Sequence, residues 1–211
     1  MILKKLVLGP LSTNTYIFGS IKSQRDVVII DPGAEANKII EVIENLDANP
    51  IAVLLTHGHF DHSRKVKKIV RTYQIPLMYN KKEYENEIFS QKKADRWLEE
   101  GDIIEINDIT LHVLETPGHS PGALSFYTSE ITDYNGQTID GIIFTGDLLF
   151  RRSIGRSDVR GGNQNQLFSS IKKKIMQNPN LTDNFVIFPG HMDVTTVGDE
   201  RNYNMFKRYF T

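Results

Sequence analysis

The sequence contains no cysteine. Disulfide bonds, thiolate metal sites and cysteine nucleophiles are therefore excluded, and any metal ion would have to be bound by nitrogen and oxygen atoms. The absence does not decide the compartment, because cysteine-free proteins occur in every one.

The sequence also has no excess of charge and no long apolar run. Its 25 lysines and arginines nearly balance its 26 aspartates and glutamates, for a formal net charge of -1. Such a balance gives no electrostatic footprint for a polyanion, so we do not expect nucleic acid as a partner. No apolar run approaches the ~20 residues that span a bilayer, and residues 1–9 are too short an apolar stretch for a signal peptide. We therefore expect a soluble cytoplasmic protein without a membrane partner.

The chain has enough apolar residues to bury a core. They make up 39% of its 211 residues, and we expect one domain that spans residues 1–211. Short apolar runs predict strands at 3–8, 15–18, 27–30, 51–55, 103–106, 110–115, 123–127, 142–145 and 185–188. Apolar residues at three- and four-residue steps predict helices at 37–46 and 63–73.

Local signals add a turn and two further helices. Asn135 followed by Gly136 predicts a hairpin turn. Asn163 predicts the cap of a helix that carries Leu167 and Ile171 on its apolar face. A last predicted helix presents three aromatic side chains, Tyr203, Phe206 and Phe210.

A basic run occupies residues 64–68, within the predicted helix 63–73. The apolar residues of this segment recur along one helix face. The basic residues then fall on the outer face, and they are Arg64, Lys67, Lys68 and Arg71. This pattern favours a solvated helix face over a nucleic-acid patch.

Five of the six histidines fall in three short motifs, each directly after a predicted strand. They are His57, His59 and His62 in residues 56–62, His119 in residues 116–119, and His191 in residues 189–191. Two carboxylates accompany them, because Asp61 lies in the first motif and Asp147 follows the strand 142–145. Strand ends at one edge of a sheet are where sites gather in mixed α/β architectures. One such histidine would suggest a hydrogen-bonded turn residue, but five at these positions predict a metal site.

The first motif can serve two metal ions. In an extended segment, residues two apart point the same way, so His57, His59 and Asp61 are expected on one side, with His62 turned to another. Imidazole and carboxylate ligands suit zinc, iron or manganese. Asp147 could bridge two cations that lie ~3.5–4 Å apart, a spacing at which metal pairs activate water.

Two other polar residues have competing interpretations. His112 lies in mid-strand on the face opposite the apolar residues, which favours an ordinary surface histidine. Asp31 could hold the second nitrogen of a ligand imidazole, or it could form a turn with Pro32 and Gly33.

The order of these motifs resembles the metallo-β-lactamase fold superfamily. The resemblance implies an α+β fold, a four-layer αββα sandwich of two mixed sheets with helices outside. It implies that His57, His59 and His119 hold a first metal ion. It further implies that Asp61, His62 and His191 hold a second and that Asp147 bridges the two, with Asp61 and Asp147 as the catalytic carboxylates. Two divalent ions are expected, zinc first and iron or manganese as alternatives.

Within that superfamily, two pairs of segments resemble the compact glyoxalase-II-like hydrolases, 146–150 with 153–158 and 189–191 with 195–201. This resemblance implies cleavage of a thioester such as S-lactoylglutathione. The chain departs from full-length glyoxalase II enzymes at one point, because only residues 192–211 follow His191. Those enzymes carry a C-terminal helical extension with glutathione-binding residues there. A second resemblance, through Gly155-Arg-Ser-Asp158, is to mono-iron persulfide dioxygenases, which gives an oxidoreductase as the alternative.

The proposed ligand set also bears on the substrate. Every motif histidine is used as a ligand, so none remains as a general acid for the leaving group. A thiolate, from a thiol of pKa ~8.5, leaves without such help, which favours thioesters over amides. Arg152 and Arg156 follow Asp147 and could either contact an anionic substrate or have a structural role. Phe60 and Phe150 could line the pocket or belong to the core.

Overall fold

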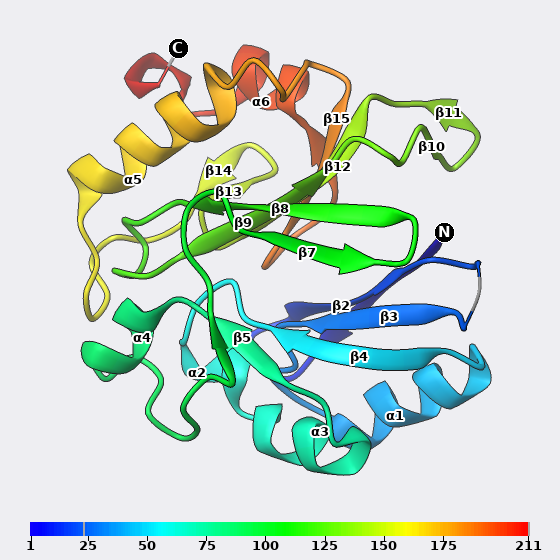
Figure 1. Cartoon of the computed structure of the whole chain (residues 1–211). Coiled ribbons are helices and arrows are strands. Elements are labelled where there is room, and N and C mark those ends of the chain that lie inside the picture. Colours follow the sequence, from blue (N-terminus) through cyan, green and yellow to red (C-terminus); the bar gives the residue numbers. More distant parts are fainter. Residues whose placement is uncertain (23, 211) are drawn as a thin grey trace.

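The chain folds into two six-stranded sheets that pack face to face, with helices on both outer faces (Figure 1). The computed structural model describes residues 1–22 and 24–210. The four layers follow one another as helices, sheet, sheet and helices, which confirms the predicted αββα sandwich of the α+β class. Among the described residues, no helix is long and apolar enough to cross a membrane.

The first sheet is formed by the first six strands in chain order. They are β1 (Ile2–Leu8), β2 (Thr13–Gly19), β3 (Asp26–Ile30), β4 (Asn49–Leu54), β5 (Leu77–Tyr79) and β6 (Arg96–Trp97). The strands β1 to β3 are antiparallel, and those from β3 to β6 are parallel. Two helices, α1 (Ala36–Asn45) and α3 (Val66–Tyr73), cover its outer face.

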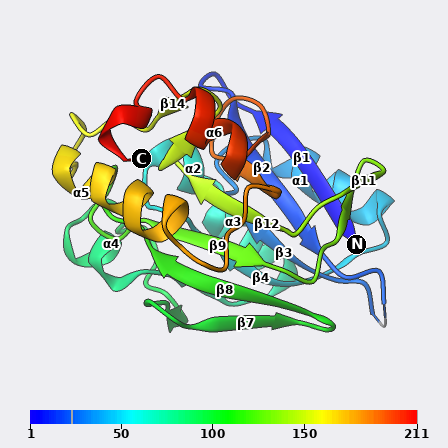
Figure 2. The same cartoon turned by 90° about the horizontal axis from the view of Figure 1, so that it is seen from above.

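The second sheet has the strand order β16-β15-β12-β9-β8-β7. Its strands are β7 (Ile103–Ile106), β8 (Ile109–Glu115), β9 (Leu124–Thr128), β12 (Gly141–Gly146), β15 (Phe185–Pro189) and β16 (Thr195–Thr196). Its outer face is covered by α5 (Gln164–Ser170), which continues as a π-helix (Ile171–Met176), and by α6 (Val197–Tyr203), as Figure 2 shows from above.

Four short elements and a final helical turn complete the fold. They are α2 (Phe60–Ser63), α4 (Lys81–Glu85), the hairpins β10 (Asp133–Tyr134) with β11 (Gln137–Thr138) and β13 (Leu149–Phe150) with β14 (Ser153–Ile154), and a 3-10 helix (Lys207–Tyr209). The predicted turn at Asn135 and Gly136 joins β10 to β11, and both residues have positive φ, as such a turn requires.

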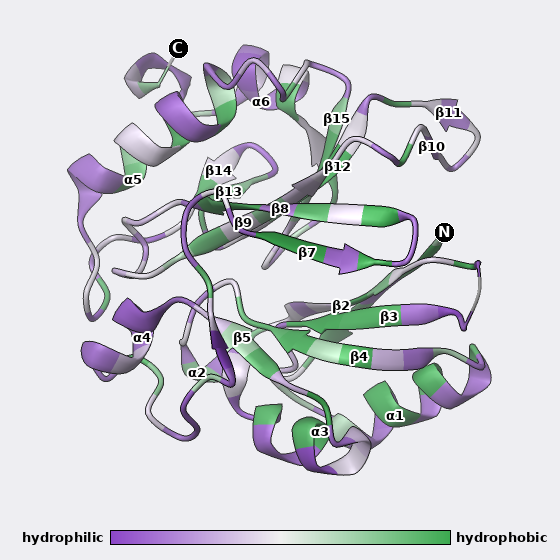
Figure 3. Ribbon diagram, in the orientation of Figure 1, coloured by the Kyte–Doolittle hydropathy of each residue, from purple (hydrophilic) through white to green (hydrophobic). Residues whose placement is uncertain are grey.

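The core lies mainly between the two sheets, and aromatic rings fill its centre. Phe144 is fully buried there, with its ring centroid 5.1 Å from that of Tyr16 and 5.5 Å from that of Phe188. Two further clusters lie under the helix layers, where Ile39 and Ile171 are fully buried. Figure 3 shows the hydrophobic colour concentrated on the strands and on the inner faces of the helices.

The predicted strands are all present, but two predicted helices are interrupted. The segment predicted as one helix, 63–73, is divided between α2 and α3, because Lys65 leaves the helical conformation with φ -101° and ψ 1°. The last predicted helix ends at Tyr203. The next residue, Asn204, has extended backbone, and its side chain accepts a hydrogen bond from the Phe206 N–H (2.9 Å).

Candidate metal centre

Four strands of the two sheets deliver the predicted site residues to one end of the sandwich. The loop after β4 carries His57 and His59, and α2 follows it directly. The loops after β8, β12 and β15 carry His119, Asp147 and His191. The two sheets therefore contribute to one site.

Gly190 lies where the backbone passes so close to the site that no side chain would fit. A Cβ atom at Gly190 would lie 2.2 Å from Asp147 Oδ1 and 2.7 Å from His62 Cε1. Any larger residue there would displace these two side chains, so Gly190 permits His191 to approach them.

The seven predicted residues form two groups of three around Asp147. His57, His59 and His119 form one group, and Asp61, His62 and His191 form the other, with one ligand atom per residue and these atoms within 4.8 Å of one another. Asp147 contacts both groups. Its Oδ2 lies 3.4 Å from His119 Nε2 and 3.5 Å from His191 Nε2, and its Oδ1 lies 3.3 Å from His62 Nε2.

The histidines of the first group are held neutral. Burial, aided by the nearby His119, lowers the pKa of His59 to about 4. Burial also lowers the pKa of His57 and of His119. His59 Nδ1 lies 2.8 Å from His119 Nε2. Neutral imidazoles have lone pairs available for a metal ion at neutral pH.

The second group carries charge. Burial lowers the pKa of His191, but its contacts with Asp147 and Asp61 outweigh this effect and raise the pKa to about 9. Burial also raises the pKa of Asp61, yet its contact with His191 and the charge of His62 lower it to about 2. Burial lowers the pKa of His62, but its contacts with Asp147 and Asp31 together outweigh this effect and raise it. Without a metal ion, this group is a network of protonated imidazoles and carboxylates.

The donor set fits divalent metal ions. Within the described part of the chain, His57 Nε2 and Asp147 Oδ1 are buried and have no hydrogen-bond partner. A buried polar atom without a partner is costly unless something binds it. Five imidazoles and two carboxylates at one place provide nitrogen and oxygen ligands of the type that zinc, iron and manganese take.

Further groups orient the imidazole rings through their other nitrogens. His62 Nδ1 lies 2.9 Å from the Asp31 carboxylate, which also accepts hydrogen bonds from the Thr56 backbone and hydroxyl. His119 Nδ1 lies 2.7 Å from the carbonyl oxygen of Arg156. Because these oxygens only accept, they fix the proton on Nδ1 and direct Nε2 into the site. Asp31 also has positive φ, and its carbonyl oxygen accepts a hydrogen bond from the Gly33 N–H (2.9 Å).

A buried carboxylate that the sequence did not reveal supports two of the loops. Glu83 lies in α4, is fully buried, and accepts hydrogen bonds from the N–H groups of Gly58 and Gly122, both at 2.6 Å. Gly58 separates His57 from His59, and Gly122 follows His119. Burial raises the pKa of Glu83. No helix was predicted at α4, and a single glutamate among charged neighbours gives no signal in the sequence.

The extended-segment prediction for the first motif is wrong at Asp61. The chain turns into α2 at Phe60, and the Asp61 carboxylate is grouped with His62 and His191 rather than with His57 and His59. The hydrogen bonds from His62 N and Ser63 N to the His59 carbonyl begin this helix.

The remaining predicted positions have mainly structural surroundings. Arg152 donates to the Asp199 carbonyl (2.9 Å) and lies over the Tyr203 ring, and thus connects its loop to α6. Arg156 forms a two-pronged, exposed ion pair with Asp158. His112 is partly buried and stacks on the ring of Tyr127, 4.9 Å between centroids, outside the site.

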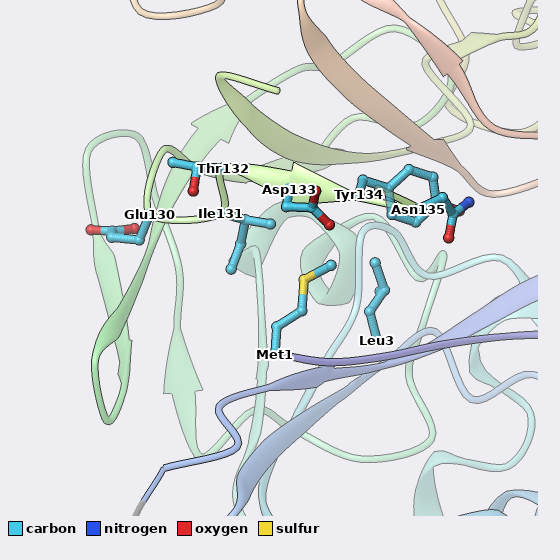
Figure 4. Close-up of a pocket in the computed structure, with 8 residues that line it drawn as sticks. All are labelled: Met1, Leu3, Glu130, Ile131, Thr132, Asp133, Tyr134 and Asn135. Carbon is cyan, nitrogen blue, oxygen red and sulfur yellow. The ribbon is translucent and has the colours of Figure 1, made fainter. Parts of the chain in front are cut away.

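The two aromatic candidates differ in position. Phe60 is 61% exposed at the edge of the site, whereas Phe150 is buried and meets the His191 ring edge-on at 5.9 Å. A separate cavity of about 480 Å³ lies at the other end of the sandwich, between the N-terminal residues and the segment 130–135 (Figure 4). Its lining contains no histidine.

A family model described as the metallo-beta-lactamase superfamily matches residues 8–191. The chain belongs to this superfamily. The match spans all seven predicted site residues, which confirms the family resemblance.

Several relatives and solved structures of this superfamily align over nearly the whole chain. The chain is 32% identical over 222 residues to the probable metallo-hydrolase YqgX of Bacillus subtilis, covering 99% of this chain and 98% of that protein. It is 32% identical over 199 residues to hydroxyacylglutathione hydrolase GloC of Haemophilus influenzae, covering 87% and 88%.

Among solved structures, BLEG-1 B3 metallo-beta-lactamase aligns with a TM-score of 0.85 at 33% identity, covering 98% of this chain and 99% of that one. ETHE1 from Myxococcus xanthus aligns with a TM-score of 0.82 at 25% identity, covering 100% and 88%. TTHA1623 in a di-iron-bound form aligns with a TM-score of 0.80 at 32% identity, covering 96% and 99%. Membership of this superfamily and the similarity to these proteins support a metal-dependent hydrolase activity for this chain.

Proposed function

We propose that this protein is a binuclear metal-dependent hydrolase that cleaves thioesters, such as S-lactoylglutathione. The observation that carries the proposal is the pair of three-residue groups joined by Asp147. His57, His59 and His119 would hold one ion, and Asp61, His62 and His191 the other. The names of two similar proteins support it, one a hydroxyacylglutathione hydrolase and one in a di-iron-bound form.

The chemistry follows from this set of residues. Two divalent ions held by these residues would lower the pKa of a bound water toward ~7 and would polarise a carbonyl oxygen. Asp147, in contact with both groups, would be a ligand common to the two ions, and Asp61 would give a second carboxylate to one of them. Asp31 and the Arg156 carbonyl keep the rings of His62 and His119 in one orientation.

The proposed substrate class follows from the lack of a histidine that could act as general acid for the leaving group. All five histidines near the centre belong to the two groups, and His112, the sixth in the chain, lies outside the site. No imidazole is then left to protonate a leaving group. A thiolate departs without a proton at neutral pH, whereas an amide nitrogen does not, and this favours thioesters.

Metal analysis combined with a substrate panel tests the proposal. We expect two equivalents of zinc, iron or manganese per chain by mass spectrometry. We also expect a thioester to be hydrolysed at least 100-fold faster than its matched amide. A lactone and a phosphodiester complete the panel of compounds to be tested. Comparable turnover of the amide would contradict the missing-acid argument.

The alternative is a mono-iron persulfide dioxygenase, which the element Gly155–Asp158 favours. Such an enzyme does not need the ligands of a second ion, whereas this chain has both groups in place. One iron per chain together with oxygen uptake on glutathione persulfide would replace the hydrolase proposal with this alternative.

A further inference from the structure

A groove lined by cations lies beside the candidate metal centre. It encloses about 810 Å³ between the turn at Gly9 and Pro10, the first residues of α1, and the segment that leads into α3. Four cationic side chains line it, Lys38, Arg64, Lys65 and Lys68. The basic residues predicted to form one solvated helix face are therefore divided, because Arg64 and Lys68 line this groove and Lys67 and Arg71 do not.

The positive charge of the groove is largely uncompensated. Glu35 is the one carboxylate in its lining, and it is engaged by Lys38 (3.7 Å) and by the Gly9 N–H (3.0 Å). Within residues 1–22 and 24–210, the side chains of Arg64, Lys65 and Lys68 form no ion pair with a carboxylate. The guanidinium of Arg64 lies instead over the Phe60 ring, 4.9 Å from its centroid. Cations gathered in a groove without partners are typical of a site for an anionic ligand.

The groove continues to the metal centre. A smaller hollow, lined by Leu11, Phe60, Asp61 and Arg64, shares Arg64 and the Gly9–Pro10 turn with it. Leu11 is 63% exposed and Phe60 61% exposed, so both present apolar surface beside Asp61. A ligand could thus place a reactive group at Asp61, an apolar linker over Phe60 and an anionic end among the lysines.

We infer that this groove binds the thiol part of the substrate, and that this part carries phosphate groups. The inference rests on the proposed thioesterase function and names its substrate class. Lysine ammonium groups bind phosphate as point charges, and arginine adds forked hydrogen bonds. Three unpaired cations match a phosphate-bearing thiol such as coenzyme A. Glutathione, with two carboxylates and one ammonium, has a smaller net charge.

The reaction is hydrolysis of the thioester bond. The oxygen of water forms a bond to the acyl carbon, the carbon–sulfur bond breaks, and sulfur leaves as the thiolate with the bonding electron pair. One proton of the water passes to solvent and the other to the departed thiolate, so the products are a carboxylate and a free thiol. No oxidant or further reactant is needed.

The test compares three thioesters of one acyl group, made with coenzyme A, glutathione and neutral N-acetylcysteamine. The variant Lys65→Glu/Lys68→Glu reverses two charges in the groove, and Lys67→Glu is the control, since Lys67 is on α3 but does not line the groove. We expect the ratio of kcat/KM for the coenzyme A ester to that for the neutral ester to fall about tenfold or more in the double variant. Each exposed charge pair contributes a few-fold, and reversal adds repulsion. The control should keep the ratio of the unchanged chain.

A binding measurement separates the groove from the chemistry. Adenosine 3′,5′-bisphosphate carries the phosphates without a thiol or an ester. Calorimetry of this probe should show binding that weakens with salt and is lost in the double variant but not in Lys67→Glu. Thermal unfolding of each variant checks that it is folded.

The outcomes distinguish the two proposals. If the thioesters are cleaved but the ratio is the same in the double variant and the unchanged chain, the groove inference is wrong and the thioesterase proposal stands. The same conclusion follows if the charge reversal affects the glutathione ester more than the coenzyme A ester. If none of the thioesters is cleaved by the metal-loaded protein, the proposed function itself is wrong.

Discussion

Replacement of Glu83 tests whether the two histidine loops depend on one buried carboxylate. Its two oxygens accept hydrogen bonds of 2.6 Å from Gly58 N–H and Gly122 N–H. Hydrogen bonds to a charged group contribute ~1.5–3 kcal/mol each. Glu83→Ala leaves both donors unpaired in the interior, so the free energy of unfolding should fall by ~3–6 kcal/mol. In Glu83→Gln one oxygen still accepts while the amide NH₂ faces the other donor, and we expect a loss of ~1–3 kcal/mol.

Urea unfolding of the metal-free chain measures this loss, with Glu85→Gln as control. Glu85 is on the same helix but forms an exposed ion pair with Lys81, and such pairs contribute ~0–1 kcal/mol. Because Glu83 positions the loops of His59 and His119, metal affinity measured by chelator competition well below the unfolding temperature should also fall in Glu83→Gln. A loss of stability with unchanged affinity would show that Glu83 only stabilises the fold. A loss no larger than that of the control would refute the reasoning.

Four further outcomes are expected. Asp147→Ala should release metal and abolish hydrolysis, while the exposed Asp193→Ala should do neither; full activity with two ions retained would overturn the bridging role. The pKa of His191 is raised from 6.5 to about 9 in the folded, metal-free chain. The stability that this histidine contributes is therefore fully present below pH 6.5 and is lost as the pH rises through 9. Thermal unfolding measured across this pH range would detect the loss. Since metal ions must displace that proton, metal affinity should rise over the same range with proton release measurable by calorimetry, and a flat profile would argue against His191 as a ligand. Phe144→Ala removes the ring at the centre of the core and should cost ~3–5 kcal/mol in urea unfolding.

The elements that the sequence predicted correctly are those with local causes. Strands that are buried on both faces, such as β2 and β12, appear in the sequence as apolar runs. The Asn163 side chain caps α5 by accepting from Gln166 N–H (3.0 Å), a bond between residues three apart. The turn at Asn135 and Gly136 needs only the positive φ that both adopt.

The errors arose where distant contacts decide the conformation. Nothing near Asp61 marks the change from an extended loop to α2, and its partners are distant in sequence. Thr13 donates to its carboxylate (2.8 Å), and a Cβ at Gly33 would overlap the Asp61 carbonyl oxygen. The choice between the two roles considered for Arg152 also depended on distant contacts, because its partners lie in α6, about fifty residues further along.

The sequence by itself determined the chemistry of the site. The absence of cysteine restricts any metal ion to nitrogen and oxygen ligands. The local apolar pattern sets the strand ends, and it therefore places the histidines and aspartates directly after strands. The tertiary structure decided which of these residues meet, that Asp147 lies between the two groups, that Glu83 supports two loops, and that part of the basic run lines a groove. Those relations depend on how the two sheets pack against each other, and packing between residues far apart in the chain leaves no periodic trace in the sequence.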